Sequence, residues 1–191
     1  MLGKSASGKD TIYHKLKEDE RISFSYIVGY TTRPMREGEC EGREYHFVTK
    51  ETMDALEEAG KVIECRCYDT VYGKWYYATV DDGSVDLEHE DYLLIGTLES
   101  YKSIRQYYGP NAVYPIYIHV EDGLRLSRAL SRERTQEEPK YAELCRRFLA
   151  DCADFSKENI LDAGIDKFYE NIDLNECYEE IVKDICSQKK N

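Results

Sequence analysis

The sequence has no hydrophobic run long enough to cross a membrane as a helix. Such a helix needs about 20 consecutive apolar residues, and every apolar stretch here is much shorter. The first residues also lack the charged and apolar regions of a secretory signal peptide. We therefore expect a protein that neither inserts into a membrane nor carries such a signal.

Cys-x-x-Cys pairs are absent from the sequence, although it contains seven cysteines. Cys65 and Cys67 alternate in a predicted strand, so their side chains point the same way. One interpretation is a metal site, and the other is a pair of buried or half-buried free thiols. Reduced cysteines are typical of cytoplasmic proteins, so we expect this location.

Basic residues are in deficit, with 26 Lys and Arg against 38 Asp and Glu, which gives a formal charge of −12. An acidic surface argues against a general nucleic-acid binder. It leaves room for a phosphate ligand, because a local basic pocket can lie within an acidic envelope. Hydrophobic residues make up 41% of the 191 residues, which is typical of one globular domain. The sequence does not distinguish a monomer from a homodimer.

A glycine-rich loop at the start of the chain predicts phosphate binding. Gly3 and Gly8-Lys9 have the spacing G-x-x-x-x-G-K, in which inward-pointing backbone N–H groups cradle phosphate oxygens. The helix that follows directs its positive N-terminal end at the same place. We predict that this segment binds ATP through Gly3, Lys4, Ser5, Ala6, Ser7, Gly8, Lys9, Asp10 and Thr11, with Lys9 as a catalytic residue.

Two departures from that pattern concern the metal and the preceding strand. Asp10 stands where Ser or Thr normally contacts Mg²⁺, and we predict that its carboxylate holds the metal directly or through water. Only Met1 and Leu2 precede the loop. Either the strand before the loop is very short, or the given start lies inside the native gene product.

The order of predicted elements indicates an α/β fold. It has a mostly parallel sheet flanked by helices, as in P-loop kinases, with a flap of mixed strands and an arginine-rich lid. We divide a single domain into a core (1–32, 80–131 and 142–191), an acceptor-binding flap (about 33–79) and a lid (about 132–141). Predicted helices cover residues 9–20, 50–59, 81–88, 99–107, 122–133, 141–161 and the C-terminal segment, and predicted strands cover 24–30, 45–48, 61–68, 71–79, 92–98, 114–120 and 167–169.

The segment from Tyr30 to Val48, TTRPMREGECEGREYHFV after its first residue, is the most specific stretch. It resembles the pattern T-T-R-x-x-R-x-G-E-x-x-G-x-x-Y-x-F of the guanylate kinase family. Arginine forks suit a phosphate monoester, because they donate charge-assisted hydrogen bonds to its oxygens. The resemblance implies that Arg33, Arg36, Tyr45 and Tyr72 bind the acceptor phosphate.

Base recognition follows from the same resemblance. Glu64 matches the family glutamate that accepts hydrogen bonds from guanine, a donor pair that adenine lacks. Lys74 replaces a small hydroxyl residue and could donate to a guanine oxygen. Thr97 and Ile95 stand where the family has aspartates, and we include Thr97 among the predicted substrate-binding residues. Gly29 stands where the family pattern has a serine.

An arginine-rich segment resembles the lid of the same family. Transferred phosphoryl groups spread negative charge over their oxygens, and arginines placed there stabilise it. The resemblance implies that Arg132 and Arg147 are catalytic, and that Arg134 and Asn171 bind the donor nucleotide. Ordinary ion pairs along the helices are the alternative for the arginines.

The resemblance implies in-line phosphoryl transfer from ATP, with Mg²⁺, to GMP, giving ADP and GDP. Closure of the flap and lid would exclude water. One alternative is a related kinase with another phosphorylated acceptor, such as ribose bisphosphate, which the missing acids at Ile95 and Thr97 favour. The other is a binding module without catalysis, which Asp10 and the short first strand favour.

Overall fold

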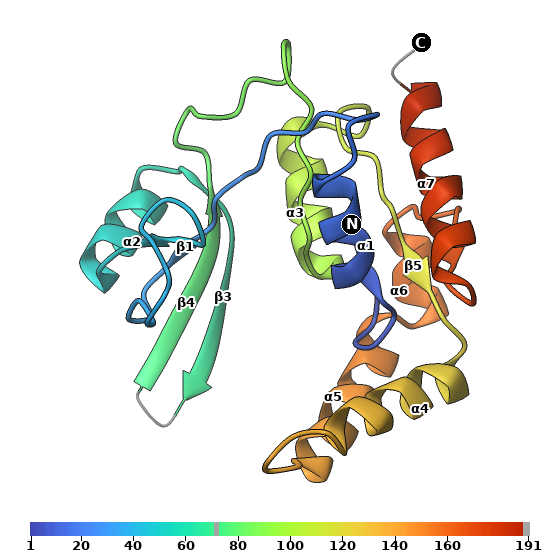
Figure 1. Ribbon diagram of the computed structural model, residues 1–191. Coiled ribbons are helices and arrows are strands. Elements are labelled where there is room, and N and C mark those ends of the chain that lie inside the picture. Colours follow the sequence, from blue (N-terminus) through green and yellow to red (C-terminus); the bar gives the residue numbers. More distant parts are fainter. Residues whose placement is uncertain (71–72, 189–191) are drawn as a thin grey trace. The chain divides into compact units, whose positions relative to one another are not determined.

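In this computed structural model we describe residues 1–70 and 73–188. The chain divides into two compact units. The first contains residues 1–23, 95–102 and 114–191, and the second contains residues 24–94 and 103–113. Both units combine helices with strands (Figure 1), so the predicted α/β class is confirmed.

Short parallel pairings organise the first unit. Leu2 forms a parallel bridge with Tyr117, and the backbone N–H of Gly96 donates to the carbonyl of Met1 at 3.1 Å. The two residues before the loop therefore pair on both sides. Strand β5 (Ile118–His119) continues the arrangement by pairing in parallel with β6 (Tyr169–Glu170).

Helices share the first unit's core with the paired strand segments. The helices are α1 (Lys9–Lys17), α4 (Asp122–Glu133), α5 (Tyr141–Asp154), α6 (Lys157–Asp162) and α7 (Leu174–Gln188), while α3 (Leu98–Tyr108) runs from this unit into the other. Ile12 of α1 and Ile181 of α7 are fully buried, and the two helices pack together (Figure 1). Burial of an isoleucine side chain contributes about 1.5–3 kcal/mol. This packing fixes the start of α1, where the glycine-rich loop ends.

A mixed four-stranded sheet forms the centre of the second unit. Its order is β2-β1-β4-β3, with β1 and β2 parallel and the other pairs antiparallel. The elements are β1 (Tyr30–Thr31), β2 (His46–Phe47), α2 (Lys50–Glu58), β3 (Val62–Thr70) and β4 (Gly73–Val80). Mixed strands were predicted here, and the structure confirms them.

Strand register gives the β3–β4 hairpin two different faces. Met53 of α2 packs with Ala78 and Val80 on one face. The other face, which we call the polar face, carries Thr31, Glu64, Arg66, Tyr77 and Thr79, since Glu64 pairs with Thr79, Arg66 with Tyr77, and Thr31 with Tyr77. The register shifts between Val62 and Glu64, which marks a bulge that sets the direction of Glu64.

Two predicted helices differ from the structure. Residues 81–88 form turns, because Asp81 and Asp82 accept hydrogen bonds from the backbone N–H groups of Gly83 and Ser84. The predicted helix over 141–161 is two helices, α5 and α6. Ser156 separates them, since its hydroxyl accepts the N–H of Asn159 and begins α6.

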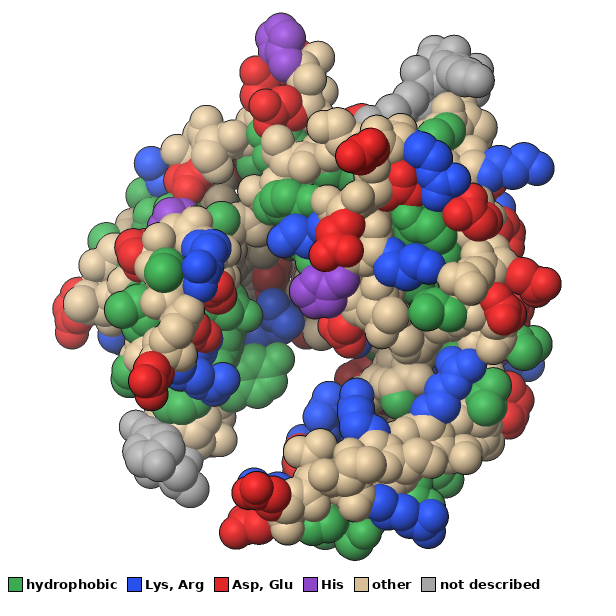
Figure 2. All heavy atoms as spheres, viewed as in Figure 1, with side chains coloured by type: hydrophobic (Ala, Val, Ile, Leu, Met, Phe, Trp, Pro, Cys, Tyr) green, Lys and Arg blue, Asp and Glu red, His purple; other side chains and the backbone are tan. Residues whose placement is uncertain are grey.

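Other predictions concern the surface and the thiols. No helix within the described residues is long and apolar enough to span a membrane. Acidic and basic side chains are interspersed over the face shown in Figure 2. All seven cysteines are free, and Cys65 and Cys67 are exposed rather than buried. The described part of the chain has no cluster of three or more potential metal ligands among His, Cys, Asp and Glu.

Candidate active site

The glycine-rich loop takes a conformation that requires glycine at both ends. Gly3 has φ of 157° and Gly8 has φ of 84°. A Cβ on Gly3 would lie 2.7 Å from the Ser7 Oγ and 2.8 Å from the Ile118 carbonyl oxygen. Any side chain at Gly3 would therefore displace the loop or β5. The Ser7 amide donates to the Lys4 carbonyl within this turn at 3.2 Å, and the loop leads directly into α1, whose N-terminal end suits an anion.

Asn171, which directly follows β6, holds the glycine-rich loop in place. Its Nδ2 donates to the Ser7 carbonyl oxygen at 2.7 Å, and both residues are buried. Its own backbone N–H donates to the carbonyl of His119 at 2.9 Å, which ties it to the end of β5. A Cβ on Gly8 would collide with the same Nδ2. In this structure Asn171 supports the loop, and its predicted contact with the donor nucleotide stays a prediction.

Lys9 and Asp10 lie at the start of α1 and form an ion pair with 3.3 Å between Nζ and Oδ2. The Asp10 side chain is 73% exposed, and Thr11 is exposed beside it. A carboxylate in that position suits Mg²⁺, which prefers oxygen ligands and usually keeps water and substrate phosphates in its coordination sphere. The residues therefore fit ATP phosphates together with Mg²⁺.

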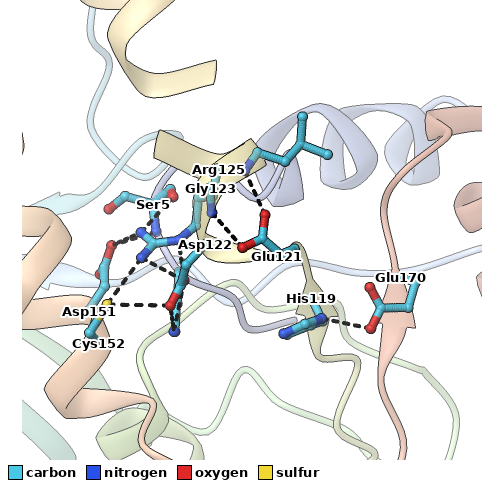
Figure 3. A network of polar contacts seen from close by, with 11 residues as sticks. Ser5, His119, Glu121, Asp122, Gly123, Arg125, Asp151, Cys152 and Glu170 are labelled. Atoms are coloured by element: carbon cyan, nitrogen blue, oxygen red, sulfur yellow. Dashed lines mark hydrogen bonds and ion pairs between the residues drawn. The ribbon is translucent and has the colours of Figure 1, made fainter. Parts of the chain in front are cut away.

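Arg125 of α4 links the loop to the two neighbouring helices (Figure 3). Its side chain contacts the Asp122 carboxylate at 3.0 Å and the Asp151 carboxylate of α5 at 3.3 Å. Asp151 also accepts the backbone N–H of Ser5 at 2.8 Å, and Lys4 contacts Asp122 at 3.1 Å. Arg125 is only 1% exposed, so this network holds the loop against α4 and α5.

The cations of this network stabilise the Asp122 carboxylate. Burial alone would raise the pKa of Asp122, but its hydrogen bonds with Lys4 and Arg125 hold that pKa below its usual value. The guanidinium of Arg125 also lies 4.0 Å from the ring centroid of Phe148, within the range of a cation–π contact. The N-terminus of α4 is capped by Glu121, which accepts the N–H groups of Gly123 and Leu124 (Figure 3).

Two of the predicted catalytic residues lie together beside the loop. Arg147 donates from Nη2 to the Ser5 Oγ at 3.3 Å. Arg132 and Arg147 both line a cavity of about 180 Å³ that also contains Ser5, Arg125 and Phe148. The structure thus brings the α4 and α5 arginines to the edge of the glycine-rich loop.

The lid arginines differ in their partners. Arg146 pairs with Glu143 at 2.6 Å. Within residues 1–70 and 73–188, no carboxylate lies within ion-pair distance of Arg132, Arg134 or Arg147, and all three are exposed. The ion-pair alternative therefore describes Arg146, whereas Arg132 and Arg147 keep their charge available beside the loop. Arg134 follows the end of α4, and its supporting role stays a prediction.

Arg33 is the most buried of the predicted phosphate-binding residues that the structure describes in the second unit. It is 4% exposed, and its two terminal nitrogens contact the Glu39 carboxylate at 2.7 and 2.5 Å. Its guanidinium carbon lies 5.2 Å from the ring centroid of Tyr45. Hydrogen bonds from Arg33 and from the backbone N–H of Arg36 lower the pKa of Glu39 to about 2, so Glu39 stays ionised at neutral pH.

The remaining acceptor-site residues are less uniform. Arg36 is exposed, and Tyr72 lies outside the described residues. Tyr45 is half-buried, packs edge-on against Tyr77 with 5.6 Å between ring centroids, and has a pKa raised by burial. Arg33 and Tyr45 therefore lie together at the polar face, since Tyr77 belongs to it.

Predicted base-reading residues occupy different places. The Glu64 carboxylate is buried on the polar face and accepts the Thr79 hydroxyl at 2.8 Å. Lys74 pairs with Asp69 in the hairpin, which puts it on the opposite face from Glu64. Thr97 precedes α3 and accepts the backbone N–H of Ser100 at 3.2 Å. The register thus does not bring Lys74 to Glu64, and Thr97 serves as a helix cap.

Comparison with known proteins adds the family. The family model for guanylate kinase matches residues 1–187. The chain belongs to the guanylate kinase family. A crystal structure of guanylate kinase from Anaplasma phagocytophilum has the same fold, with a TM-score of 0.63 and 18% sequence identity. The match covers 100% of this chain and 85% of that chain. The chain is therefore a guanylate kinase-type nucleotide kinase by family.

Sequence reasoning missed several members of this guanylate kinase-family site. Glu39, which holds Arg33, stands in the quoted family pattern but had no assigned role. Asp151 had no signal in the sequence, because its partners Ser5 and Arg125 are distant along the chain. Asp122 had a signal, because Arg125 follows it three residues later on the same helix. Arg66 also had a signal in the sequence, because residues two apart on a strand, such as Glu64 and Arg66, share a face. In the structure its Nε contacts Glu64 at 3.1 Å.

Proposed function

We propose that this protein transfers the γ-phosphoryl group of ATP to GMP, giving ADP and GDP. The observation that carries the proposal is the contact of Arg147 with Ser5, because it brings an arginine that has no carboxylate partner in the described part of the chain to the glycine-rich loop. Phosphoryl transfer needs little covalent chemistry from the protein, and positioning with charge stabilisation supplies most of the rate enhancement.

On the donor side, the loop amides and Lys9 would hold the β- and γ-phosphates of ATP. Asp10 would hold Mg²⁺, which neutralises charge on the phosphate oxygens when it is bound. Arg132 and Arg147 would stabilise the charge that spreads over the transferred group. The buried Arg125 contacts both the glycine-rich loop and Asp151 of α5. It would therefore hold Arg147 of α5 beside the loop before the nucleotide binds.

On the acceptor side, Arg33, Arg36 and Tyr45 would bind the phosphate of GMP. This group carries a charge near −2, so it is already a nucleophile and needs no general base. Glu39 keeps the Arg33 fork ordered, which lowers the entropy that phosphate binding costs. Glu64 would accept hydrogen bonds from the guanine N1–H and amino groups.

The test is an assay of ADP formation with GMP, dGMP, AMP and ribose bisphosphate as acceptors. GMP should stimulate ATP consumption most, and a Lys9→Met variant should lose this stimulation. Preference for ribose bisphosphate would instead support the related kinase that Ile95 and Thr97 favour. Absence of Mg·ATP binding by calorimetry would leave a binding module and refute the proposal.

A further inference from the structure

Glu64 and Arg66 form a pair of opposite charges on the polar face of β3. The Arg66 Nε lies 3.1 Å from Glu64 Oε2, and Nη2 lies 3.5 Å from Oε1. The Glu64 side chain is 5% exposed and that of Arg66 is 30% exposed. The pair therefore presents a buried acceptor and a more accessible donor side by side.

Both groups keep unused hydrogen-bonding capacity. The carboxylate has about four lone-pair sites, and Thr79 and Arg66 occupy two or three of them. The guanidinium has five N–H groups, and Glu64 is its one recorded hydrogen-bond acceptor among residues 1–70 and 73–188. A ligand that carries one hydrogen-bond acceptor beside its donors could therefore bind to Glu64 and Arg66 at the same time.

We propose that Arg66 is a specificity-determining residue that donates to the 6-oxo group of guanine while Glu64 accepts from its N1–H and 2-amino groups. This inference rests on the proposed GMP kinase function. The guanine edge runs acceptor, donor, donor, which matches one cation next to one carboxylate. Arginine is a common partner of the guanine O6 and N7 acceptors.

Adenine is rejected at two points of the same pair. Its 6-amino group is a donor and would face the guanidinium of Arg66, and its N1 is an acceptor that would face the Glu64 carboxylate. Each mismatch leaves a buried polar group without a partner. Arg66 thereby discriminates guanine from adenine. Lys74 lies on the opposite face of the hairpin from Glu64, and Thr97 caps a helix.

The test compares acceptors that differ at one atom. GMP and 6-thio-GMP share both donors, but the thio compound replaces the 6-oxo oxygen by sulfur, a weak acceptor. IMP keeps the 6-oxo group and N1–H and lacks the 2-amino group. For Arg66→Met we expect kcat/KM to fall about 10- to 100-fold with GMP and IMP, and to change little with 6-thio-GMP.

Arg66→Lys should recover part of the activity with GMP, because it keeps a charged donor. Arg43→Met is the matched control, since Arg43 is an exposed arginine of the same unit that pairs with Glu44, and it should retain wild-type kcat/KM. Thermal unfolding of each variant identifies any loss that comes from misfolding, and 6-thio-GMP activity provides the same check within one preparation.

An equal fall with GMP, IMP and 6-thio-GMP would overturn the inference, because it would assign Arg66 to the acceptor phosphate or to folding. Calorimetric titration of GMP and 6-thio-GMP separates this result from failure of the proposed function. An Arg66-dependent preference for GMP in binding, without any phosphoryl transfer, would refute the kinase activity and support the base-reading role. Equal binding of the two nucleotides by the wild type would refute the base-reading role alone.

Discussion

Arginine side chains in this protein fall into groups according to what their guanidinium groups contact. Arg125 and Arg33 are buried against carboxylates, and Arg146 pairs with Glu143 on the surface. Arg132 and Arg147 line one cavity beside Ser5 without a carboxylate partner among the described residues. Among these five arginines, Arg132 and Arg147 are therefore the two whose charge is not already paired with a carboxylate of the described residues.

Arg147→Ala should therefore reduce kcat strongly with little effect on stability. An arginine that stabilises the transferred phosphoryl group contributes about 10³-fold or more, and we expect a loss of that order. Arg146→Ala is the matched control, because Arg146 is the exposed neighbour that pairs with Glu143. Steady-state ADP formation at saturating ATP and GMP measures both. Similar kcat values for the two variants would exclude a catalytic role for Arg147.

Arg125→Met should destabilise the fold. It leaves Asp151 without its cation while Asp151 still accepts the Ser5 N–H. Loss of one partner of a buried pair costs about 3–5 kcal/mol, and since Asp122 is half exposed we expect about 2–4 kcal/mol. Urea denaturation measures the loss in free energy of unfolding. Arg128→Met on the same helix is the control, because the Arg128 side chain donates to a backbone carbonyl, that of Ile172. A change below about 1 kcal/mol would show that the network contributes little.

Local sequence signals predicted some elements accurately and others badly. Helix α2 follows Thr49, whose hydroxyl accepts the Thr52 N–H, as the sequence predicted. Periodicity continues through the junction of α5 and α6, so it could not reveal their separation. Ser156 before an acidic first turn was the available signal. Residues 81–88 were predicted as a helix, but their short acidic side chains satisfy the backbone locally.

Ser156→Ala should weaken α6 and lower the free energy of unfolding by about 1 kcal/mol, because the Asn159 N–H loses its cap. Ser131→Ala, at an exposed position inside α4, should leave stability unchanged or slightly higher. Chemical denaturation of both variants gives the comparison. Equal effects at the two positions would argue that the Ser156 cap does not stabilise the helix.

At the scale of the whole molecule, the predicted donor residues all lie in the first unit, and most predicted acceptor residues lie in the second. The family resemblance identified these sets from motifs, but it could not identify the pairings inside them. Glu39 with Arg33, and Glu64 with Arg66, depend on turn and strand geometry. Thr97 is the exception, because it lies in the first unit.

Each nucleotide should therefore stabilise the protein through its own set of residues. Ligand at about 100 times its Kd stabilises by about 2.7 kcal/mol, which thermal unfolding detects as a higher Tm. We expect Lys9→Met to lose the Tm increase with Mg·ATP and keep that with GMP, and Arg36→Met to do the reverse. Lys183→Met, an exposed change in α7, serves as the control. Loss of both increases in either variant would contradict this separation.

Acid should destabilise the protein in part through Glu39. Its folded-state pKa of about 2 lies below the ordinary value of 4.5, so the unfolded chain binds more protons between these values. The stability that Glu39 contributes is thus present above about pH 4.5 and is lost as pH falls toward 2. Urea midpoints between pH 2 and 6 should fall less steeply for Glu39→Gln than for the exposed Glu37→Gln. Equal slopes would exclude this contribution.

The bulge between Val62 and Glu64 is the one place among the described residues of this hairpin where β3 holds an extra residue. Val62 pairs with Val80 and Glu64 pairs with the adjacent Thr79, so Ile63 is left without a partner across the ladder. Loss of Ile63 would therefore keep Glu64 and Arg66 on the polar face. Loss of Cys65, where the ladder is regular, would instead move either Glu64 or Arg66 to the face that packs on α2. Relatives with the same recognition chemistry should therefore vary in length at the bulge more readily than between these two residues.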